Sequence, residues 1–355
     1  MYDVNNSTEI SQALDAMDRF MKRFVAFPSD LDRYSVVLWA AHTHLLDCFD
    51  STPRLVLSSP EKQSGKSRCL EVLTLFVPEA LHASSISPAA MFRRIAQDPR
   101  PTLLLDEYDT VWNNRPSEGA EELRALVNGG HRRGASTWRC SGSNHEVREF
   151  PIFAAVALAG IGYLPDTIVD RSVVVKMRRR GPGEHVEQIR YVYDIDGYDI
   201  RDQFTEACEP YRESLQGFQV ENPLADRAAD VWEPLLIIGE IAGGHWKQRS
   251  LEAALAASNT EVLVDSVGVE LLKDVRKIWP TGEASLEVSS LLKFLISEPE
   301  MRWGEFKGKP LTARGLAQLL KSYGIKSSRT SSARFYHYRE IKDVWDRYLP
   351  SLQAS

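Results

Sequence analysis

The residues with the clearest chemical potential lie in the stretch SSPEKQSGKS, from Ser58 to Ser67. It ends in Gly65-Lys66-Ser67, as loops that bind nucleotide phosphates end, and it stands between the apolar run LVLSS and a segment with helical periodicity. A strand that leads through a loop into a helix directs backbone N–H groups and the positive end of the helix at one spot. We expect Lys66 to reach the β- and γ-phosphates of ATP and the Ser67 hydroxyl to bind Mg²⁺.

The start of this loop departs from the usual pattern GxxxxGK[ST], because Pro60 stands in place of the first glycine. Proline has a fixed φ and no N–H, so the entry of the loop must be shaped differently. The last four positions, which carry most phosphate contacts, are intact. The alternative is a chance Gly-Lys-Ser in a surface turn. The expected nucleotide-binding residues are Pro60, Glu61, Lys62, Gln63, Ser64, Gly65, Lys66, Ser67 and Arg68.

Two adjacent acids in LLLDEYD, Asp106 and Glu107, follow another apolar run. Carboxylates at the carboxyl end of a buried strand lie where open α/β sheets bind ligands. We expect Asp106 to hold the Mg²⁺ and its water shell, and Glu107 to polarise the attacking water. A solvated acidic turn is the alternative. The joint occurrence of loop and acids, each after a buried strand, favours a nucleotide site.

Arg171 in PDTIVDRS precedes the fifth expected strand, where an arginine can point out of its own subunit toward the γ-phosphate of a neighbour. Such a finger accelerates hydrolysis by roughly 10³–10⁵. The alternative is a structural Asp170–Arg171 pair. Arg132 and Arg133 are rivals for the role, and Arg227 is a further candidate that serves equally well as one half of a surface ion pair.

The stretch ASTWRCSGSNHEVREF alternates on both sides of a small polar centre, which predicts a β-hairpin. Arg139, His145 and Arg148 flank its tip, so we expect a pore loop that touches a nucleic-acid backbone. A plain surface hairpin is the alternative. His42 and His44 point apart on a helix, which disfavours a metal site there.

The C-terminal stretch from Arg302 to Arg347 holds eleven Lys or Arg and four acids, a charge of +7, which leaves −13 for the rest of the chain. Its pattern is helix, turn, helix and a basic, aromatic hairpin, the layout of a winged helix. Lys326, Arg329 and Arg334 are the residues we expect to contact DNA. A winged helix that binds only protein is the alternative.

The elements that must position these residues alternate between apolar strands and helices, which indicates a parallel α/β sheet. We expect an N-terminal helical segment over 1–50, an ATPase core over 51–182, a helical lid over 183–280 and a winged-helix module over 281–355. Four cysteines without a CxxC pair suggest reduced thiols in the cytoplasm. The absence of an 18-residue apolar run argues against a membrane span.

The order loop, acid pair, hairpin, fourth strand, arginine and helical lid resembles the AAA+ P-loop ATPases, in particular the branch with a pre-sensor hairpin that includes superfamily 3 helicases. More narrowly, LWAAHTHLLDCFDSTPRLVLSSPEKQSGKS, VNGGHRRGA, DRAADVWEPLL and VWDRYLP are similar to an uncharacterised actinobacterial and phage domain family, often attached to primase modules of mobile elements. The fourth strand ends in LAGIG, where such ATPases present a polar sensor residue.

The resemblance implies a P-loop fold with a helical lid that hydrolyses ATP with Mg²⁺ between subunits of a ring, expected to be hexameric. It carries over to Lys66, Ser67, Asp106, Glu107 and Arg171. We therefore expect a DNA motor or replication factor, with primase or other replication proteins as further partners. Two alternatives stay open: an ATP-switched loader or initiator that does not translocate, and a defence or plasmid-control ATPase whose winged helix binds a protein.

Overall fold

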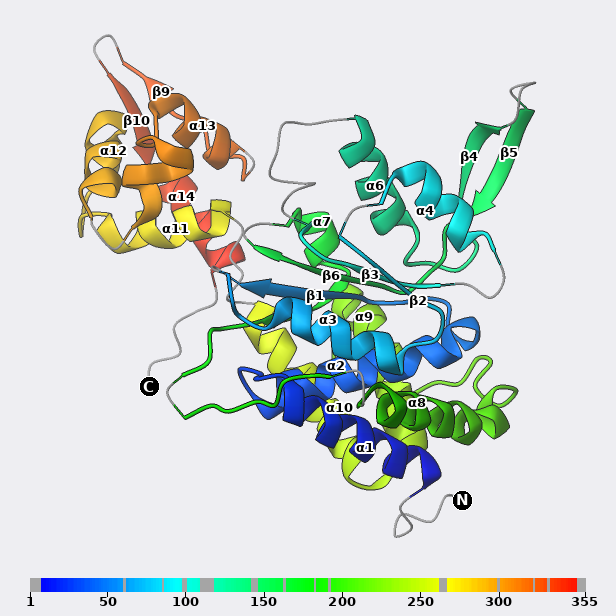
Figure 1. Cartoon of the computed structure of the whole chain (residues 1–355). Helices are drawn as coiled ribbons and strands as arrows, with labels where there is room; N and C mark the ends of the chain where they lie inside the picture. The colour runs from blue at the N-terminus through cyan, green and yellow to red at the C-terminus, as the bar shows by residue number, and fades with distance from the viewer. Residues whose placement is uncertain are drawn as a thin grey trace. The chain divides into compact units, whose positions relative to one another are not determined.

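The computed structural model describes residues 8–59, 62–84, 86–97, 101–108, 118–141, 146–161, 164–181, 183–190, 193–261, 267–298, 301–321, 323–330 and 333–349. The chain forms two compact units, Met1–Thr260 and Glu261–Ser355. The first unit is built on a five-stranded parallel sheet with the strand order β2-β3-β6-β1-β7 (Figure 1). Its strands are β1 (Arg54–Ser59), β2 (Ala80–Ala83), β3 (Thr102–Leu105), β6 (Val156–Ile161) and β7 (Ser172–Lys176).

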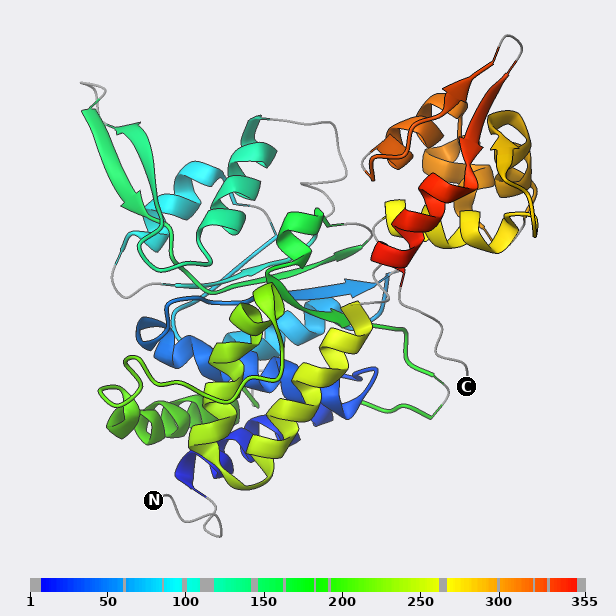
Figure 2. The same ribbon diagram turned by 180° about the vertical axis from the view of Figure 1, so that it is seen from behind.

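The strands β1, β3 and β6 are short, mostly apolar and largely buried because helices cover both faces of the sheet, whereas the edge strand β2 is partly exposed. One face packs against α4 (Pro88–Ile95), α6 (Glu118–Gly129) and α7 (Asp166–Val169). The other face packs against a layer of six helices, whose members are α1 (Glu9–Phe24), α2 (Asp30–His42), α3 (Lys66–Phe76), α8 (Asp194–Cys208), α9 (Asp226–Ala242) and α10 (Gly244–Glu261). Figure 2 shows α9 and α10 from behind. The expected mixed α/β architecture with a parallel sheet is confirmed.

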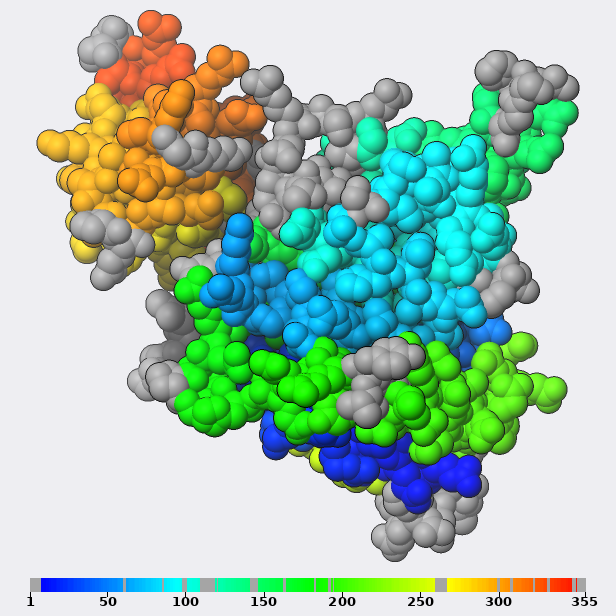
Figure 3. All heavy atoms as spheres, viewed as in Figure 1, coloured from blue at the N-terminus to red at the C-terminus, as the bar shows by residue number. Residues whose placement is uncertain are grey.

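The N-terminal helices are part of this layer rather than a separate appendage. In α1 the apolar residues Ile10, Leu14, Met17 and Met21 recur every three or four positions and are buried, the spacing that gives a helix one apolar face. The Thr8 hydroxyl caps the helix by accepting from the Ser11 N–H at 3.1 Å. Figure 3 shows the chain after β7 and α8, in green, between the blue α3 and the dark blue α1.

Two buried histidines hold the end of α2 and the short 3₁₀ helix η1 (Thr43–Cys48) against the rest of this layer through hydrogen bonds. His42 Nδ1 donates to the Trp39 carbonyl, and its Nε2 lies 2.9 Å from Thr52 Oγ1. His44 Nε2 donates to the Phe76 carbonyl at 2.7 Å. The described residues contain no group of three or more His, Cys, Asp or Glu that could hold a metal ion, so these imidazoles act as hydrogen-bonding groups of the core.

The second unit has a hydrophobic core of its own. Its three-stranded sheet has the order β8-β10-β9. Its elements are α11 (Val267–Ile278), β8 (Ser285–Glu287), α12 (Val288–Ser297), η4 (Arg302–Gly308), α13 (Ala313–Lys321), β9 (Ser328–Arg329), β10 (Arg334–His337) and α14 (Tyr338–Tyr348). The unit includes α11, which was expected to belong to the lid over 183–280, because Leu271, Leu272 and Val275 are part of this core.

The first unit also contains a separate two-stranded hairpin and the short 3₁₀ helix η3. The hairpin strands β4 (Ser136–Ser141) and β5 (Glu146–Pro151) stand between α6 and β6 in the chain, as expected, and η3 (Glu209–Tyr211) follows α8.

No helix in the described parts of the chain combines the length and apolar character that a bilayer crossing requires.

Candidate functional site

The loop after β1 turns sharply into α3. Gly65 precedes the helix with a φ of +84°, a left-handed conformation that glycine adopts without strain, and Gln63 has a φ of +63°. The helix begins at Lys66, so its first unpaired N–H groups point toward the loop. Lys62, Gln63, Ser64 and Gly65 are described, whereas Pro60 and Glu61 lie outside the described residues.

The Lys66 side chain is buried inside this loop. Its Nζ donates to Ser59 Oγ at the end of β1 and to Ser64 Oγ at 3.0 Å. A cation at the N-terminus of a helix is electrostatically unfavourable because the helix end is itself positive. An anion bound at the loop would relieve this cost, since it would face the ammonium group and the helix end together. Ser67 is exposed in the first turn, and Arg68 forms an ion pair with Glu71 at 3.1 Å.

The two acids follow β3 at the same edge of the sheet. The Asp106 N–H donates to the carbonyl of Ala83, and Asp106 Oδ1 accepts from the Glu107 N–H at 2.9 Å. Glu107 is exposed and has a left-handed φ of +57°, the kind of backbone strain that clusters at functional sites.

Only β6 separates β1 from β3. Neighbouring strands lie about 4.8 Å apart, so the axes of β1 and β3 are roughly 10 Å apart. This spacing leaves room for a phosphate group and a metal ion between Lys66 and Asp106. The donors fit the expected Mg²⁺, which prefers oxygen ligands and is held by one or two carboxylates together with phosphate oxygens. Ser67 and Asp106 supply a hydroxyl and a carboxylate at this edge.

A cavity of about 430 Å³ lies beside the loop. Its walls bring together the end of α1, the loop residues Gln63 and Ser64, the side of α3 and the segment after β7. The Arg179 Nε donates to the Lys62 carbonyl at 3.0 Å, and Arg23 forms a bidentate ion pair with Glu187. These walls come from segments far from the loop in the chain and carry no motif, so local sequence patterns do not predict them. The lining residues outside the loop are Phe24, Val25, Ala26, Arg68, Arg180, Val186, Glu187 and Gln188.

Arg171 lies at the opposite edge of the sheet. Its carbonyl accepts from the Arg54 N–H at the start of β1, whereas Lys66 contacts Ser59 at the end of the same strand. The six residues of β1 span about 15–20 Å. The structure therefore does not bring Arg171 together with Lys66 within one copy of the chain. Asp170 pairs with Arg227 at 2.7 Å rather than with Arg171.

The β4–β5 hairpin turns its two expected DNA-contacting arginines toward one face, since Arg139 and Arg148 are direct cross-strand partners. Arg139 reaches Glu122 of α6 at 2.7 Å, and Arg148 pairs with Glu146 at 3.0 Å. On the other face Trp138 is 62% exposed. His145 lies outside the described residues.

Three exposed basic residues of the second unit lie on or just before its β9–β10 ribbon. Lys326, Arg329 and Arg334 are exposed, and Arg329 and Arg334 are direct cross-strand partners. Like charges opposite each other destabilise a sheet. Among the described residues neither arginine has a carboxylate partner, so a polyanion would stabilise this arrangement.

A curated relative from Saccharopolyspora erythraea, an uncharacterized 28.9 kDa protein in the xis 5′ region, is 32% identical over 185 residues, which cover 49% of this chain and 69% of the relative. Residues 176–348 match the family described as a protein of unknown function, DUF3631. The chain belongs to the DUF3631 family.

In this DUF3631 protein the family match begins at the end of β7 and runs through the rest of the helical layer into the second unit. Lys66, Asp106 and Glu107 lie ahead of the matched residues. Among solved structures, the apo A form of the NrS-1 C-terminal region aligns with 94% of this chain and 77% of its own, with 12% identity and a TM-score of 0.43.

Proposed function

We propose that this DUF3631 protein is a Mg²⁺-dependent ATPase of the AAA+ P-loop type that assembles with copies of itself and acts on DNA. One observation carries the proposal. A buried lysine at the start of α3 and an acid pair at the end of β3 share the carboxyl edge of a parallel sheet, with one strand between them. Parallel sheets bind ligands at this edge.

Each residue at the edge has a distinct task in this proposal. Lys66 and the N–H groups of the loop hold the β- and γ-phosphates, and the neighbouring cavity of about 430 Å³ takes the rest of the nucleotide. Ser67 and Asp106 hold Mg²⁺, which neutralises charge on the phosphate oxygens. Glu107, exposed beside Asp106, orients the attacking water and accepts its proton.

Hydrolysis at full rate then requires a second copy. Arg171 lies about the length of β1 away from Lys66 of its own chain, so it serves the nucleotide of a neighbour. This geometry favours a ring, in which every copy is both donor and acceptor of an arginine. The arginine contributes roughly 10³–10⁵ in rate in related chemistry.

DNA is the proposed partner because two hairpins each carry a cross-strand arginine pair. The Arg329–Arg334 pair in the second unit lacks carboxylate partners within the described residues, and it fits the expected winged-helix contact with a phosphate backbone. A mobile-element setting agrees with the name of the Saccharopolyspora erythraea relative, which places that protein in the xis 5′ region.

The decisive experiment compares ATP hydrolysis by the wild-type chain and Lys66→Ala, with Lys247→Ala as a matched control. Lys247 forms a surface ion pair with Glu240 at 2.8 Å on the helical layer. Lys66→Ala should lose nucleotide binding and hydrolysis, whereas Glu107→Gln should retain binding and lose hydrolysis. Unchanged hydrolysis by Lys66→Ala, at equal purity, refutes the proposal.

A DNA motor and an ATP-switched loader or initiator differ in whether they require ATP hydrolysis. A motor unwinds a forked duplex with ATP and not with a non-hydrolysable analogue, whereas a loader or initiator assembles on DNA with either. DNA affinity should fall steeply with salt, because each neutralised phosphate releases a counterion. A flat salt response would point to a protein partner for the basic ribbon instead.

A further inference from the structure

We propose that a cavity in the second unit binds an unpaired base of a single-stranded nucleic acid, and that Tyr338 is the surface on which the base stacks. The inference rests on the proposed function only for the choice of nucleic acid as the partner. The cavity lies between the end of α11, the turn at 280–284 and one face of α14. Its volume of about 580 Å³ is within the range of sites that hold small ligands.

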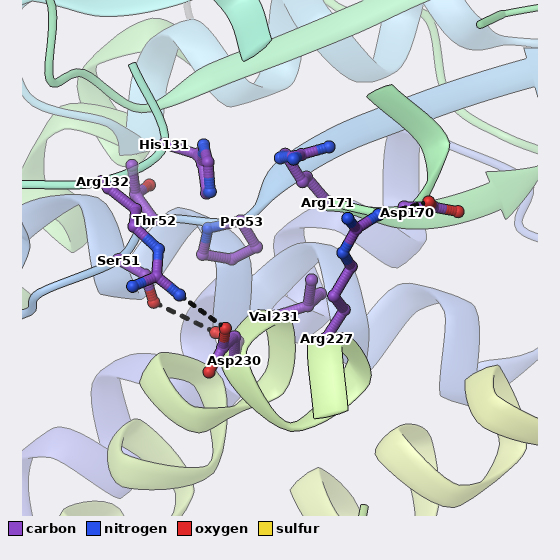
Figure 4. Close-up of a pocket in the computed structure, with 10 residues that line it drawn as sticks. All are labelled: Ser51, Thr52, Pro53, His131, Arg132, Asp170, Arg171, Arg227, Asp230 and Val231. Atoms are coloured by element: carbon purple, nitrogen blue, oxygen red, sulfur yellow. Dashed lines mark hydrogen bonds and ion pairs between the residues drawn. The ribbon is translucent and has the colours of Figure 1, made fainter. Parts of the chain in front are cut away.

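Aromatic rings set this cavity apart from the pocket around Arg171 in the first unit. That pocket holds three arginines and two aspartates (Figure 4). The cavity instead brings together Trp279, directly after α11, with Tyr338 and Trp345 of α14. Tyr338 and Trp345 are seven residues apart, so they lie on the same face of the helix. Figure 1 shows α14, in red, beside α11, in yellow.

The spacing of the rings indicates a flat ligand rather than a cation. Their centroids lie 5.8 to 6.0 Å apart and their planes meet at 51° to 83°. The rings therefore pack against one another, and they leave no gap for a quaternary ammonium group of the kind that an aromatic cage binds. Arg276 and Lys342 also line the cavity, and their positive charges oppose a cationic ligand.

Tyr338 is the ring that a ligand can reach. Its exposed fraction is 39%, against 9% for Trp279 and 3% for Trp345. The Trp279 indole N–H donates to the Glu283 carbonyl at 3.0 Å, and the Trp345 indole N–H donates to the Leu272 carbonyl at 2.9 Å. These hydrogen bonds hold the two buried rings in place against Tyr338. A base that stacks on Tyr338 therefore requires little further ordering of side chains.

The charged groups of the cavity fit a ligand that carries an anionic group beside its flat one. Arg276 is exposed and forms no ion pair within the described residues. Lys342 Nζ pairs with Asp346 at 2.5 Å, and because an exposed pair of this kind contributes little to stability, Lys342 can also serve a phosphate. The remaining charged group, Glu283, can accept a hydrogen bond from N–H groups on the edge of a base. A nucleotide carries both kinds of group.

The cavity is continuous with the basic ribbon that we expect to contact DNA. Arg334 is the first residue of β10, and Tyr338 directly follows the last. Four residues of an extended strand span about 13 Å, so one nucleic-acid strand can contact Arg334 through its backbone and place a nearby base on Tyr338. The bases of a duplex are paired and stacked on one another, whereas an unpaired base can leave the stack. The cavity therefore favours single strands over duplexes.

The test measures oligonucleotide binding to the full chain by fluorescence anisotropy, without ATP. The probes are a labelled oligothymidylate, an abasic oligomer of the same length and charge, and a duplex. Tyr338→Ala should weaken oligothymidylate binding about tenfold, the loss expected for one base stacked on an aromatic ring, and should leave the other two affinities unchanged. Tyr338→Phe should keep the wild-type affinity because it keeps the ring.

Two further variants serve as controls. Phe294→Ala removes another aromatic ring of the second unit, which is 41% exposed on α12 and does not line the cavity, so it should leave all three affinities unchanged. Arg334→Gln should weaken binding of oligothymidylate and of the abasic oligomer alike, because a backbone contact needs no base. Equal oligothymidylate affinities of the wild type and Tyr338→Ala refute the proposal, and the cavity would then suit an apolar peptide instead.

A crosslinking experiment on the wild-type chain covers the case in which Tyr338→Ala does not fold. An oligomer that contains iodouracil, irradiated with the protein, should crosslink to the peptide that contains Tyr338, and crosslinks confined to other peptides refute the proposal. Neither experiment uses ATP, so a failure of ATP hydrolysis leaves both unaffected. If the abasic oligomer binds as tightly as oligothymidylate, the base-binding cavity is wrong while the backbone contact of the ribbon stands.

Discussion

The buried histidines of the helical layer should make the first unit sensitive to mild acid. Burial lowers the pKa of His42 to about 3 and that of His44 to about 4, against an ordinary value of 6.5. Between pH 4 and 6.5 the unfolded chain therefore binds protons at these positions and the folded chain does not. The first unit keeps this stability above pH 6.5 and loses it as the pH falls. Acid favours the state that binds more protons, which here is the unfolded chain.

The magnitude follows from these values. A histidine with a pKa of about 6.5 unfolded and about 4 folded costs about 2 kcal/mol of stability between pH 7 and pH 5. His42 and His44 together should thus remove about 4 kcal/mol, a large part of the stability of an ordinary domain. Paired carboxylates add their own pH dependence, so the histidine contribution must be isolated with variants.

The variants are His42→Asn and His44→Gln, because each amide nitrogen can replace the ring nitrogen that donates to Trp39 or Phe76. Urea unfolding, followed by hydrogen exchange of peptides from α2 and α3, reports on the first unit. The double variant should lose about 4 kcal/mol less than the wild type between pH 7 and pH 5. His185→Gln controls for loss of an exposed histidine. Equal losses in the double variant and the wild type would refute the assignment of neutral, buried imidazoles.

Two further changes test the packing that positions the site. Gly239→Ala should destabilise the first unit by about 1–3 kcal/mol, because the new Cβ would lie 2.1 Å from Ser250 Oγ; Ser250→Gly should restore part of this loss, and additive effects in urea unfolding would contradict the contact. Arg54→Met should cost about 2–4 kcal/mol, because the carbonyls of Val127 and Ala154 lose their donors. Arg54→Lys should not rescue it, since lysine lacks the planar fork, and a fully stable lysine variant would count against this role.

Sequence patterns within a short segment predict the parts of the site that a single strand or hairpin forms. The apolar runs that end at Ser59 and Leu105 are the strands β1 and β3, and parallel strands necessarily present their carboxyl ends at one edge. The hairpin at 136–151 was predictable because alternation on both sides of a polar centre has a single simple interpretation.

The parts that escaped prediction depend on packing between distant segments. The cavity beside the loop needs the end of α1 and the segment after β7, which meet only in the folded unit. The direction of the Arg139 side chain depends on which face of the hairpin packs against the helices. The contact between Phe150 of the hairpin and Phe92 of α4, with 4.9 Å between the ring centroids, determines which face this is. The three-residue strand β8 is too short to show a period, and it becomes a strand only by pairing with β10.

If ATP is hydrolysed between copies of the chain as proposed, the opposite placement of Lys66 and Arg171 along β1 has a genetic consequence. A chain with Lys66→Ala still offers an intact arginine to its neighbour, and a chain with Arg171→Ala still offers an intact phosphate loop. Under the proposed function, two defective alleles expressed together should therefore complement each other, although each alone would be inactive. Random assembly in a ring would restore about a quarter of the interfaces, whereas a double substitution in one allele would be complemented by neither parent.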